Sequence, residues 1–312
     1  MNALVEVILP VFLVIGFGYV AARWAGFNEA AVDSLMRFSQ NFALPCLLFK
    51  TVASIDLAAQ AEQGLFLSFY LGAFLCFVIG YLAARHIFDR QPEDSIAIGF
   101  AAMFSNSFLL GVPITERAYG AGALAGNFTV IALHGPIFYT FGIMVMEITR
   151  SQQAASRTLM LLPQILFAVL RQPLVIGVLS GVVVNLSGLA VPTTLTAALN
   201  FIASAAVPVA LFGLGGVLTR YRPEGDMTTI AVICTLSIIV HPAITYGLGR
   251  WAFHLNVDQL RSAVMTAAMA PGVNAYLFAN LYGVAKRVNA SSLLIGTALS
   301  IFTIWGWLHI LP

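Results

Sequence analysis

Long apolar stretches, each close to 20 residues and separated by short charged breaks, occupy almost the whole chain. A helix needs roughly 20 residues to cross the hydrocarbon core of a bilayer. Unbroken apolar runs favour helices, because the strands of a membrane barrel alternate in hydropathy over about ten residues. The sequence therefore predicts an all-α integral membrane protein. Ten transmembrane helices are expected near residues 3–22, 32–53, 64–88, 94–118, 123–148, 164–185, 193–218, 228–251, 259–283 and 288–311.

Composition excludes most soluble proteins. Apolar residues make up 60% of the 312 residues and charged residues 9%, against about 45–50% and about 25% in an average soluble domain. A soluble enzyme is therefore excluded, and a net charge of +2 is too small for a nucleic-acid binder. No catalytic motif occurs in a usable context, so no enzyme and no cofactor are expected. The three cysteines lie apart in apolar runs, which indicates no metal site.

Charges between the spans predict how the helices are oriented. The loops after the odd-numbered spans carry nine Lys and Arg residues, whereas the opposite side carries four. Because basic loops stay on the cytoplasmic side, both termini are expected outside, in the cell (inner) membrane. The first span has no basic residues before it, so it is interpreted as a retained helix and not as a cleaved signal.

The two halves of the chain resemble each other. Ala43–Phe49 matches Ala206–Phe212 at an offset of 163 residues. Further matches at nearly the same offset are Pro10 with Pro173, Gly18 with Gly181, Met103 with Met269 and Tyr119 with Tyr282. Five spans per copy place the second copy upside down, and inverted repeats are typical of secondary transporters. We expect a first five-helix repeat at 1–150, a cytoplasmic linker at 151–163 and a second, inverted repeat at 164–312.

An interrupted helix is predicted at corresponding places in the two repeats. The fourth span contains Pro113, which lacks an N–H and disfavours a continuous helix, and the ninth contains Pro271-Gly272. Paired breaks of this kind indicate a transporter binding site, and two structural kinks without a ligand are the alternative. The substrate-binding candidates at the breaks are Ser105, Asn106, Ser107, Pro113, Pro271, Gly272 and Asn274.

These motifs resemble the auxin efflux carrier family over essentially the whole chain. They read N-x-x-x-x-G-x-P at 106–113, P-G-x-N at 271–274 and L-P-x-x-x-F at 44–49. The resemblance implies a fold related to the bile-acid/sodium symporters. In that fold helices 1, 2, 6 and 7 form a scaffold, helices 3–5 and 8–10 form a transport domain, and the broken helices 4 and 9 cross. It also implies organic-anion substrates, either auxin-like acids or dicarboxylates such as malonate.

Helix electrostatics favour an anion independently of the resemblance. Each helix N-terminus presents roughly half a positive charge and unpaired N–H groups. Two broken helices therefore bring enough positive potential to offset about one carboxylate. The C-terminal ends of the half-helices could also hold a cation, so an anion is favoured without being established. A channel or facilitator for anions and a sodium-coupled organic-anion symporter consequently remain alternatives.

Polar residues elsewhere in the spans extend the candidate set. His134 and His241 are proton-relay candidates because the histidine pKa lies near physiological pH, and hydrogen bonds between helices are the alternative role. Asn41 lies four residues before Pro45 and Ser204 lies four residues before Pro208, and these two prolines match between the repeats. We expect both side chains to point inward. Asn127 is expected to line the cavity or to bond a neighbouring helix.

We therefore expect a secondary transporter that moves small organic anions across the membrane by elevator-type alternating access. Its expected partners are the anion and the lipid bilayer, with no nucleic acid and no metal. The scaffold helices are the expected contact if the protein forms a homodimer.

Overall fold

The computed structural model describes residues 3–54, 63–150, 167 and 170–312. Every regular element in these residues is helical. Six helices are long and apolar enough to cross a membrane: Leu4–Trp24, Gln63–His86, Leu124–Arg150, Thr193–Leu218, Met227–Ala252 and Lys286–Ile310. Their bounds lie within about two residues of the predicted spans. The prediction of an all-α integral membrane protein is confirmed.

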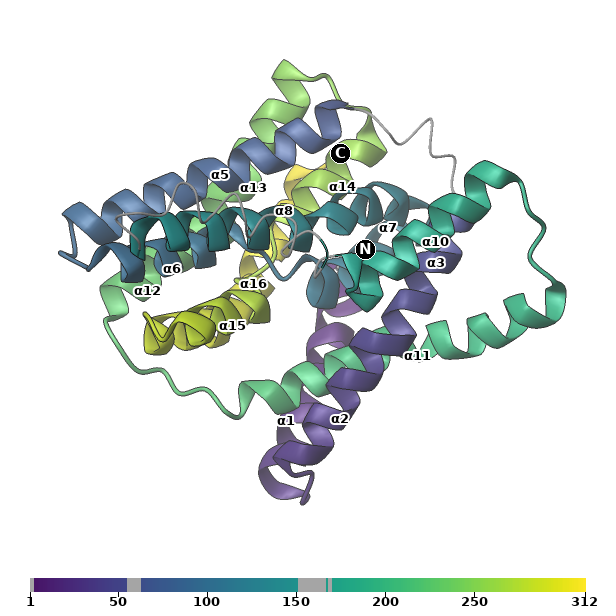
Figure 1. Cartoon of the computed structure of the whole chain (residues 1–312), viewed down its shortest axis with the longest axis horizontal. Helices are drawn as coiled ribbons and strands as arrows, with labels where there is room; N and C mark the ends of the chain where they lie inside the picture. The colour runs from purple at the N-terminus through teal and green to yellow at the C-terminus, as the bar shows by residue number, and fades with distance from the viewer. Residues whose placement is uncertain (1–2, 55–62, 151–166, 168–169) are drawn as a thin grey trace.

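One group of helices joins distant parts of the chain (Figure 1). In this group α1 (Leu9–Trp24) lies along α11 (Thr193–Leu218), and α3 (Leu44–Ser54) lies along α10 (Pro173–Ser187). The α2 helix (Glu29–Phe38) also packs on α11. We call these helices the first group; they come from the first, second, sixth and seventh predicted spans.

The second group holds the remaining helices and most of the large buried aromatic side chains. Within it α5 lies along α6 and α13, α8 contacts α14, and α16 contacts α12 and α15. Its helices are α5 (Gln63–His86), α6 (Pro92–Met103), α7 (Val112–Tyr119), α8 (Leu124–Arg150), α12 (Met227–Thr235), α13 (His241–Gly247), α14 (Val257–Ala267), α15 (Val273–Tyr282) and α16 (Lys286–Ile310). The short turns η4 (Ala121–Ala123) and η6 (Leu248–Ala252) precede α8 and follow α13.

Prolines explain where several helices widen. The π-helical turns η1 (Leu4–Ile8), η2 (Ser39–Ala43), η3 (Ser107–Gly111) and η5 (Leu236–Val240) each end two residues before a proline. Proline removes one helical hydrogen bond, and its ring clashes with the carbonyl four residues earlier. A π-turn relieves this conflict by shifting the bonding by one residue, as where the Val112 N–H donates to the Ser107 carbonyl. The helix can therefore continue through Pro113 as α7.

The sixth predicted span differs from the structure. The helix α10 covers Pro173–Ser187, so the described part of the predicted span 164–185 is interrupted at residues 171–172. Residues 164–166, 168 and 169 of that span lie outside the described residues. Gln172 has extended backbone, with ψ 132°, because the residue before a proline is driven out of the helical region. Pro173 then takes the first helical position, where its missing N–H costs nothing. The predicted linker at 151–163 lies outside the described residues.

Glycines allow the paired helices of the first group to approach closely. A Cβ atom at Gly18 would lie 1.9 Å from the carbonyl oxygen of Phe212. A Cβ at Gly177 would lie 2.6 Å from the carbonyl oxygen of Pro45. Small residues at such contacts let helices pack by close backbone approach where lipid supplies no hydrophobic driving force. The α1–α11 and α3–α10 pairs therefore depend on these positions having no side chain.

Replacing Gly18 with alanine should separate α1 from α11, because the new methyl group meets the backbone of Phe212 and cannot rotate away. We expect Gly18→Ala to lower stability by about 1–3 kcal/mol, as overpacking does in other cores. Gly16→Ala is the matched control, since a Cβ there meets nothing within 4 Å. Thermal melting of the purified variants measures both effects, and equal melting temperatures would contradict the prediction.

Candidate functional site

Two helices of the second group stop short, and their ends meet. The α6 helix ends at Met103 and η3 begins four residues later, while α14 ends at Ala267 and α15 begins at Val273. The residues between them form an antiparallel bridge that pairs Ser105 with Pro271. The interruptions predicted in the spans near 94–118 and 259–283 are therefore present, and the two breaks contact each other. We call this contact the crossover.

Two backbone hydrogen bonds hold the crossover together. The Asn106 N–H donates to the Ala270 carbonyl and the Gly272 N–H donates to the Phe104 carbonyl, each at 2.7 Å. A Cβ at Gly272 would lie 3.1 Å from the Phe104 ring and 3.3 Å from the carbonyl oxygen of Ser105. A side chain there would therefore push the two bridged segments apart. The bridge pairs backbone groups that each break removes from its helix.

The hydroxyl groups of Ser105 and Ser107 face the end of α14. Each lies 3.1 Å from the Thr266 carbonyl oxygen, and the two hydroxyls are 2.6 Å apart. Carbonyls in the last turn of a helix have no partner within the helix. The two serines predicted to bind substrate therefore bond the opposite half-helix here.

A cavity of about 320 Å³ lies beside the crossover, between the two groups of helices. We call it the crossover cavity. Seven of the predicted site residues line it: Asn41, Ser105, Asn106, Ser107, His134, Gly272 and Asn274. The first group contributes an apolar wall of Leu44, Leu48, Leu174, Val175 and Val178. Among the described residues that line it, none is Asp, Glu, Lys or Arg.

Two buried side chains at this cavity have unused hydrogen-bonding groups. Asn106 is 6% exposed and its Nδ2 has no partner among the described residues. His134 is 4% exposed and lies near the Ser105 backbone, but neither of its ring nitrogens makes a well-formed hydrogen bond to the described residues. A buried polar group without a partner costs about 1–3 kcal/mol. Such groups beside a cavity indicate where a ligand would bond.

Asn127 and His241 lie away from the crossover cavity. The Nδ2 of the fully buried Asn127 donates to Thr266 Oγ1 at 2.8 Å and to Thr115 Oγ1 at 3.3 Å, so it ties α8 to α14 and α7. His241 lies against the Phe69 ring, with centroids 4.9 Å apart, and its Nε2 is 3.2 Å from the Phe69 carbonyl oxygen. Both positions match the alternative role that the sequence left open, bonding between helices.

Pro113, Ser204 and Pro271 are not part of the lining either. Pro271 forms the bridge and packs against α16, where a Cβ at Gly296 would lie 2.7 Å from its ring. Pro113 and Ser204 line a second cavity of about 530 Å³, which α1, α3, α7 and α11 surround. We call it the second cavity. Its lining also includes Lys50, Glu116 and Arg117.

Three polar residues of the crossover cavity were not predicted. Gln40 and Gln172 line it from the first group, and the Tyr139 hydroxyl donates to the Asn274 carbonyl at 3.2 Å. Gln40 adjoins the candidate Asn41, and Gln172 adjoins a proline matched between the repeats, so a signal existed for both. Tyr139 sits in an apolar run with no such signal.

Long apolar helices and a cavity at two meeting helix breaks define a multi-pass membrane protein of the transporter class. A family model described as membrane transport protein matches residues 3–308. The chain belongs to this family, the auxin efflux carrier family, as the motifs of the crossover indicated. It is therefore a membrane transporter and not an enzyme.

Relatives from bacteria and plants match along nearly their whole length. The chain is 22% identical over 313 residues to a Rhizobium meliloti (strain 1021) protein named "Putative malonate transporter", covering 100% of this chain and 97% of the relative. It is 22% identical over 306 residues to the uncharacterized transporter YfdV of Escherichia coli (strain K12), covering 97% and 96%. It is 22% identical over 347 residues to "Probable auxin efflux carrier component 5b" of Oryza sativa subsp. japonica, covering 95% and 94%.

The two serines and Asn106 should respond differently to mutation. Ser105→Ala with Ser107→Ala removes both hydroxyls from the Thr266 carbonyl and should cost about 1–3 kcal/mol of stability. Asn106→Ala should leave the melting temperature nearly unchanged, because its Nδ2 has no partner to lose. Thermal melting without ligand compares the variants. A larger loss for Asn106→Ala than for the serine pair would contradict this division.

Proposed function

We propose that the protein is a secondary transporter that carries small organic carboxylates by elevator-type alternating access. The first group acts as the scaffold and the second group as the transport domain that carries the crossover. Its fold is then two inverted repeats of five transmembrane helices, at 1–150 and 164–312.

The observation that carries this proposal is the unpaired Asn106 amide between two helix starts. The η3–α7 segment begins at Ser107 and α15 begins at Val273, and both ends line the crossover cavity. Their first N–H groups have no acceptor within the helix, and their dipoles favour negative charge. With Asn106 Nδ2 and the Asn274 side chain, they supply donors for one carboxylate without any Lys or Arg.

The size and walls of the crossover cavity suit a small ligand. Its volume of about 320 Å³ lies at the lower end of the roughly 300–1,000 Å³ typical of ligand pockets. The apolar wall of α3 and α10 faces the polar crossover, so the rest of the molecule would rest on Leu44, Leu48 and Leu174. A carboxylate bound to the crossover and a small carbon skeleton on the wall is the arrangement that we propose.

The second cavity supports alternating access. Six lining residues of the crossover cavity match six lining residues of the second cavity when one repeat is shifted by 163 residues onto the other. The pairs are Gln40 with Ala203, Asn41 with Ser204, Leu44 with Val207, Leu48 with Leu211, Pro173 with Pro10 and Leu174 with Val11. Inverted repeats create two equivalent surfaces for one moving site. The second cavity then accepts the crossover in the opposite state.

Reciprocal contacts support the inverted repeat. Gly18 approaches the backbone of Phe212, and Gly181 approaches that of Phe49, where a Cβ at Gly181 would lie 2.9 Å from the carbonyl oxygen. At the offset of 163, Gly18 falls on Gly181 and Phe49 falls on Phe212, so the two contacts exchange. A two-fold axis in the membrane plane relates contacts in this manner.

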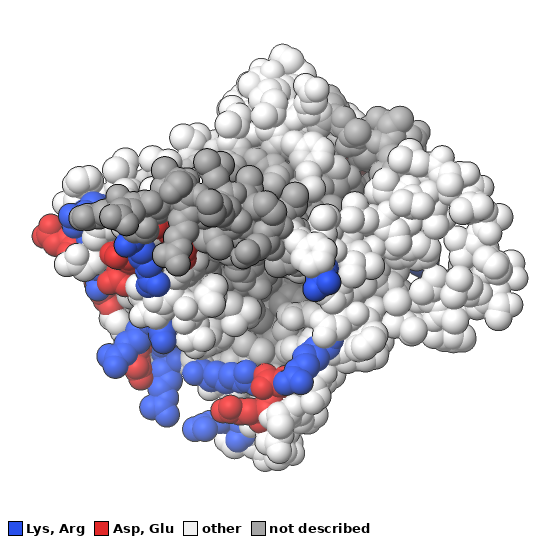
Figure 2. All heavy atoms as spheres, viewed as in Figure 1, with Lys and Arg blue, Asp and Glu red and all other residues white. Residues whose placement is uncertain are grey.

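The distribution of charge supports the proposed orientation. Figure 2 shows charged side chains gathered along one edge of the visible face, over the turn between α5 and α6 and the loop before α12. Basic loops favour the cytoplasmic side. We propose that this edge faces the cytoplasm and that both termini lie outside the inner membrane.

Removing the crossover amides should abolish transport. We expect Asn106→Ala and Asn274→Ala each to weaken carboxylate binding about 5–150-fold, because a charge-assisted hydrogen bond contributes about 1–3 kcal/mol. Asn280→Ala on the same α15 helix is the matched control, since Asn280 is exposed and does not line the cavity. Uptake of labelled malonate, a labelled monocarboxylate and a labelled amine into proteoliposomes measures the effect.

Two outcomes of that uptake assay would overturn the proposal. Wild-type transport by both crossover variants would make the amides structural. Uptake of the amine in preference to both carboxylates, or a strict requirement for sodium, would exclude this anion mechanism while leaving the fold intact.

We further propose His134 as the proton carrier when transport is coupled to protons. His134 lines the crossover cavity and contacts the Phe69 ring. His241 contacts the same ring but does not line the cavity. Among the described residues of the lining, Tyr139 is the other titratable group. His134→Gln should remove the dependence of uptake on external pH while leaving exchange at constant pH intact. His241→Gln should keep the pH dependence, and the reverse pattern between these variants would refute the assignment.

A further inference from the structure

A hollow of about 210 Å³ lies where the loop between α11 and α12 meets the start of α16. Arg220, Arg222, Lys286 and Arg287 line it, and Glu224 is the one acidic residue among the described lining. Figure 2 shows the basic side chains gathered on this edge of the molecule. We call this hollow the basic hollow.

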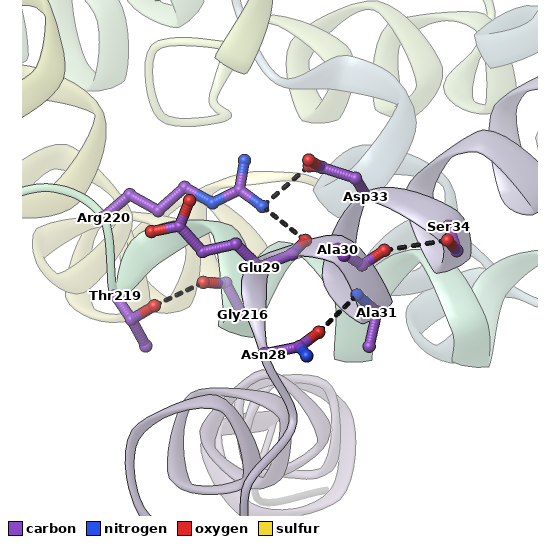
Figure 3. Close-up of polar contacts among 9 residues, drawn as sticks. All are labelled: Asn28, Glu29, Ala30, Ala31, Asp33, Ser34, Gly216, Thr219 and Arg220. Carbon is purple, nitrogen blue, oxygen red and sulfur yellow. Dashed lines mark hydrogen bonds and ion pairs between the residues drawn. The ribbon is translucent and has the colours of Figure 1, made fainter.

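Two nearby acidic residues, Asp33 and Asp226, are bonded to other groups, whereas Glu224 in the lining makes its contacts to the described residues through its backbone. Asp33 accepts from Arg220 Nη2 at 2.7 Å, and Arg220 also donates to the Glu29 carbonyl at 3.1 Å (Figure 3). Asp226 pairs with Arg90 at 3.2 Å. The Thr229 hydroxyl, the Thr228 N–H and Arg90 hold the pKa of Asp226 below its ordinary value, so this carboxylate stays charged and bonded there.

Three of the four cations of the basic hollow, unlike Arg220, have no such partners. Among the described residues, no side-chain hydrogen bond or ion pair engages Arg222, Lys286 or Arg287. Three exposed positive charges held close together repel one another. An anion placed between them would relieve that repulsion.

The loop is held so that Arg222 stays beside α16. Ser291 Oγ lies 2.9 Å from the Arg222 carbonyl, 2.6 Å from the Glu224 carbonyl and 2.9 Å from the Glu224 N–H. Gly225 turns with φ +110°, and a Cβ there would lie 3.4 Å from the Val288 side chain. These contacts fix the backbone on both sides of the hollow before any ligand binds, which lowers the ordering cost of binding.

The chemistry of the lining fits a phosphate group next to lipid. Guanidinium groups bind phosphate oxygens through two parallel hydrogen bonds. The rings of Tyr221 and Tyr276 close the hollow with centroids 4.8 Å apart, and tyrosine is enriched at the level of the headgroups. Beside Tyr276, α15 exposes Leu277 (47%) and Leu281 (67%), which offer an apolar surface to acyl chains.

We propose that the basic hollow binds the phosphate of an anionic phospholipid headgroup. The bound lipid bridges the end of α11 in the first group and α15–α16 in the second. It therefore stabilises the arrangement of the two groups seen here. This site is separate from the crossover cavity and does not depend on the substrate proposed there.

Native mass spectrometry of the full chain in detergent, with phosphatidylglycerol, phosphatidylcholine or inorganic phosphate added, tests this proposal. R222Q/R287Q should weaken phosphatidylglycerol binding about tenfold or more, since each basic residue near an anionic headgroup contributes substantially. R23Q/R37Q is the matched control, because it removes two exposed guanidinium groups outside the hollow. Melting in phosphatidylcholine alone checks folding, and K286Q replaces the double variant if that variant does not fold.

Retention of phosphatidylglycerol by the control but not by R222Q/R287Q would support the site. An equal loss of phosphatidylglycerol binding in both double variants would show that binding depends on general surface charge, and would overturn the proposed site. Equal binding of phosphatidylcholine would do the same. Inorganic phosphate that binds as tightly as the lipid would assign the hollow to a soluble anion instead.

Discussion

Backbone polar groups at a helix break inside a membrane must find partners within the protein, because lipid offers none. The crossover meets this requirement twice. Its two interruptions pair with each other through the bonds of Asn106 and Gly272, and two serine hydroxyls cap the Thr266 carbonyl. Each break thus supplies partners for backbone groups of the other, and the crossover cavity lies beside the bridge that they form.

The same requirement divides the polar residues of the site into two kinds. Ser105 and Ser107 bond the Thr266 carbonyl, which the break would otherwise leave unpaired, and Asn127 bonds the hydroxyls of Thr115 and Thr266. Asn106 has its backbone in the bridge and its side-chain amide free at the cavity. A residue that fixes the crossover with one group and presents another to a ligand links binding to the geometry of the break. In the proposed function, a bound substrate and the apolar wall of the first group would both lie against the two segments that the bridge joins.

Sequence reasoning located the breaks because proline disfavours a continuous helix and glycine, with its free backbone, weakens one. Pro113 and Pro271-Gly272 stand near the interruptions, and the apolar length of the spans predicted six helix bounds closely. Hydrogen-bond partners could not be predicted, because Asn127 and Asn106 look alike in the sequence and differ only in what surrounds them. The π-turn before Pro113 lets the helix continue from η3 into α7. Pro113 therefore lies within a helix beyond the break, where it lines the second cavity and not the crossover cavity. Tyr139 enters the site through packing across the bundle, which no local pattern records.

The two cavities differ in the chemistry that they offer, although the offset of 163 relates their walls. At matched positions the crossover cavity has the amides of Gln40 and Asn41, whereas the second cavity has Ala203 and Ser204. The second cavity also contains the Lys50 ammonium, and the repeat places Gly213 at the position that matches Lys50. Under the alternating access proposed above, amides would face the anion on one side of the membrane, and the charges of Lys50, Glu116 and Arg117 would stand near it on the other. Since fixed charges act on a carboxylate over a longer range than a neutral amide does, that proposal implies unequal affinities at the two faces, even where the backbone of the two repeats matches.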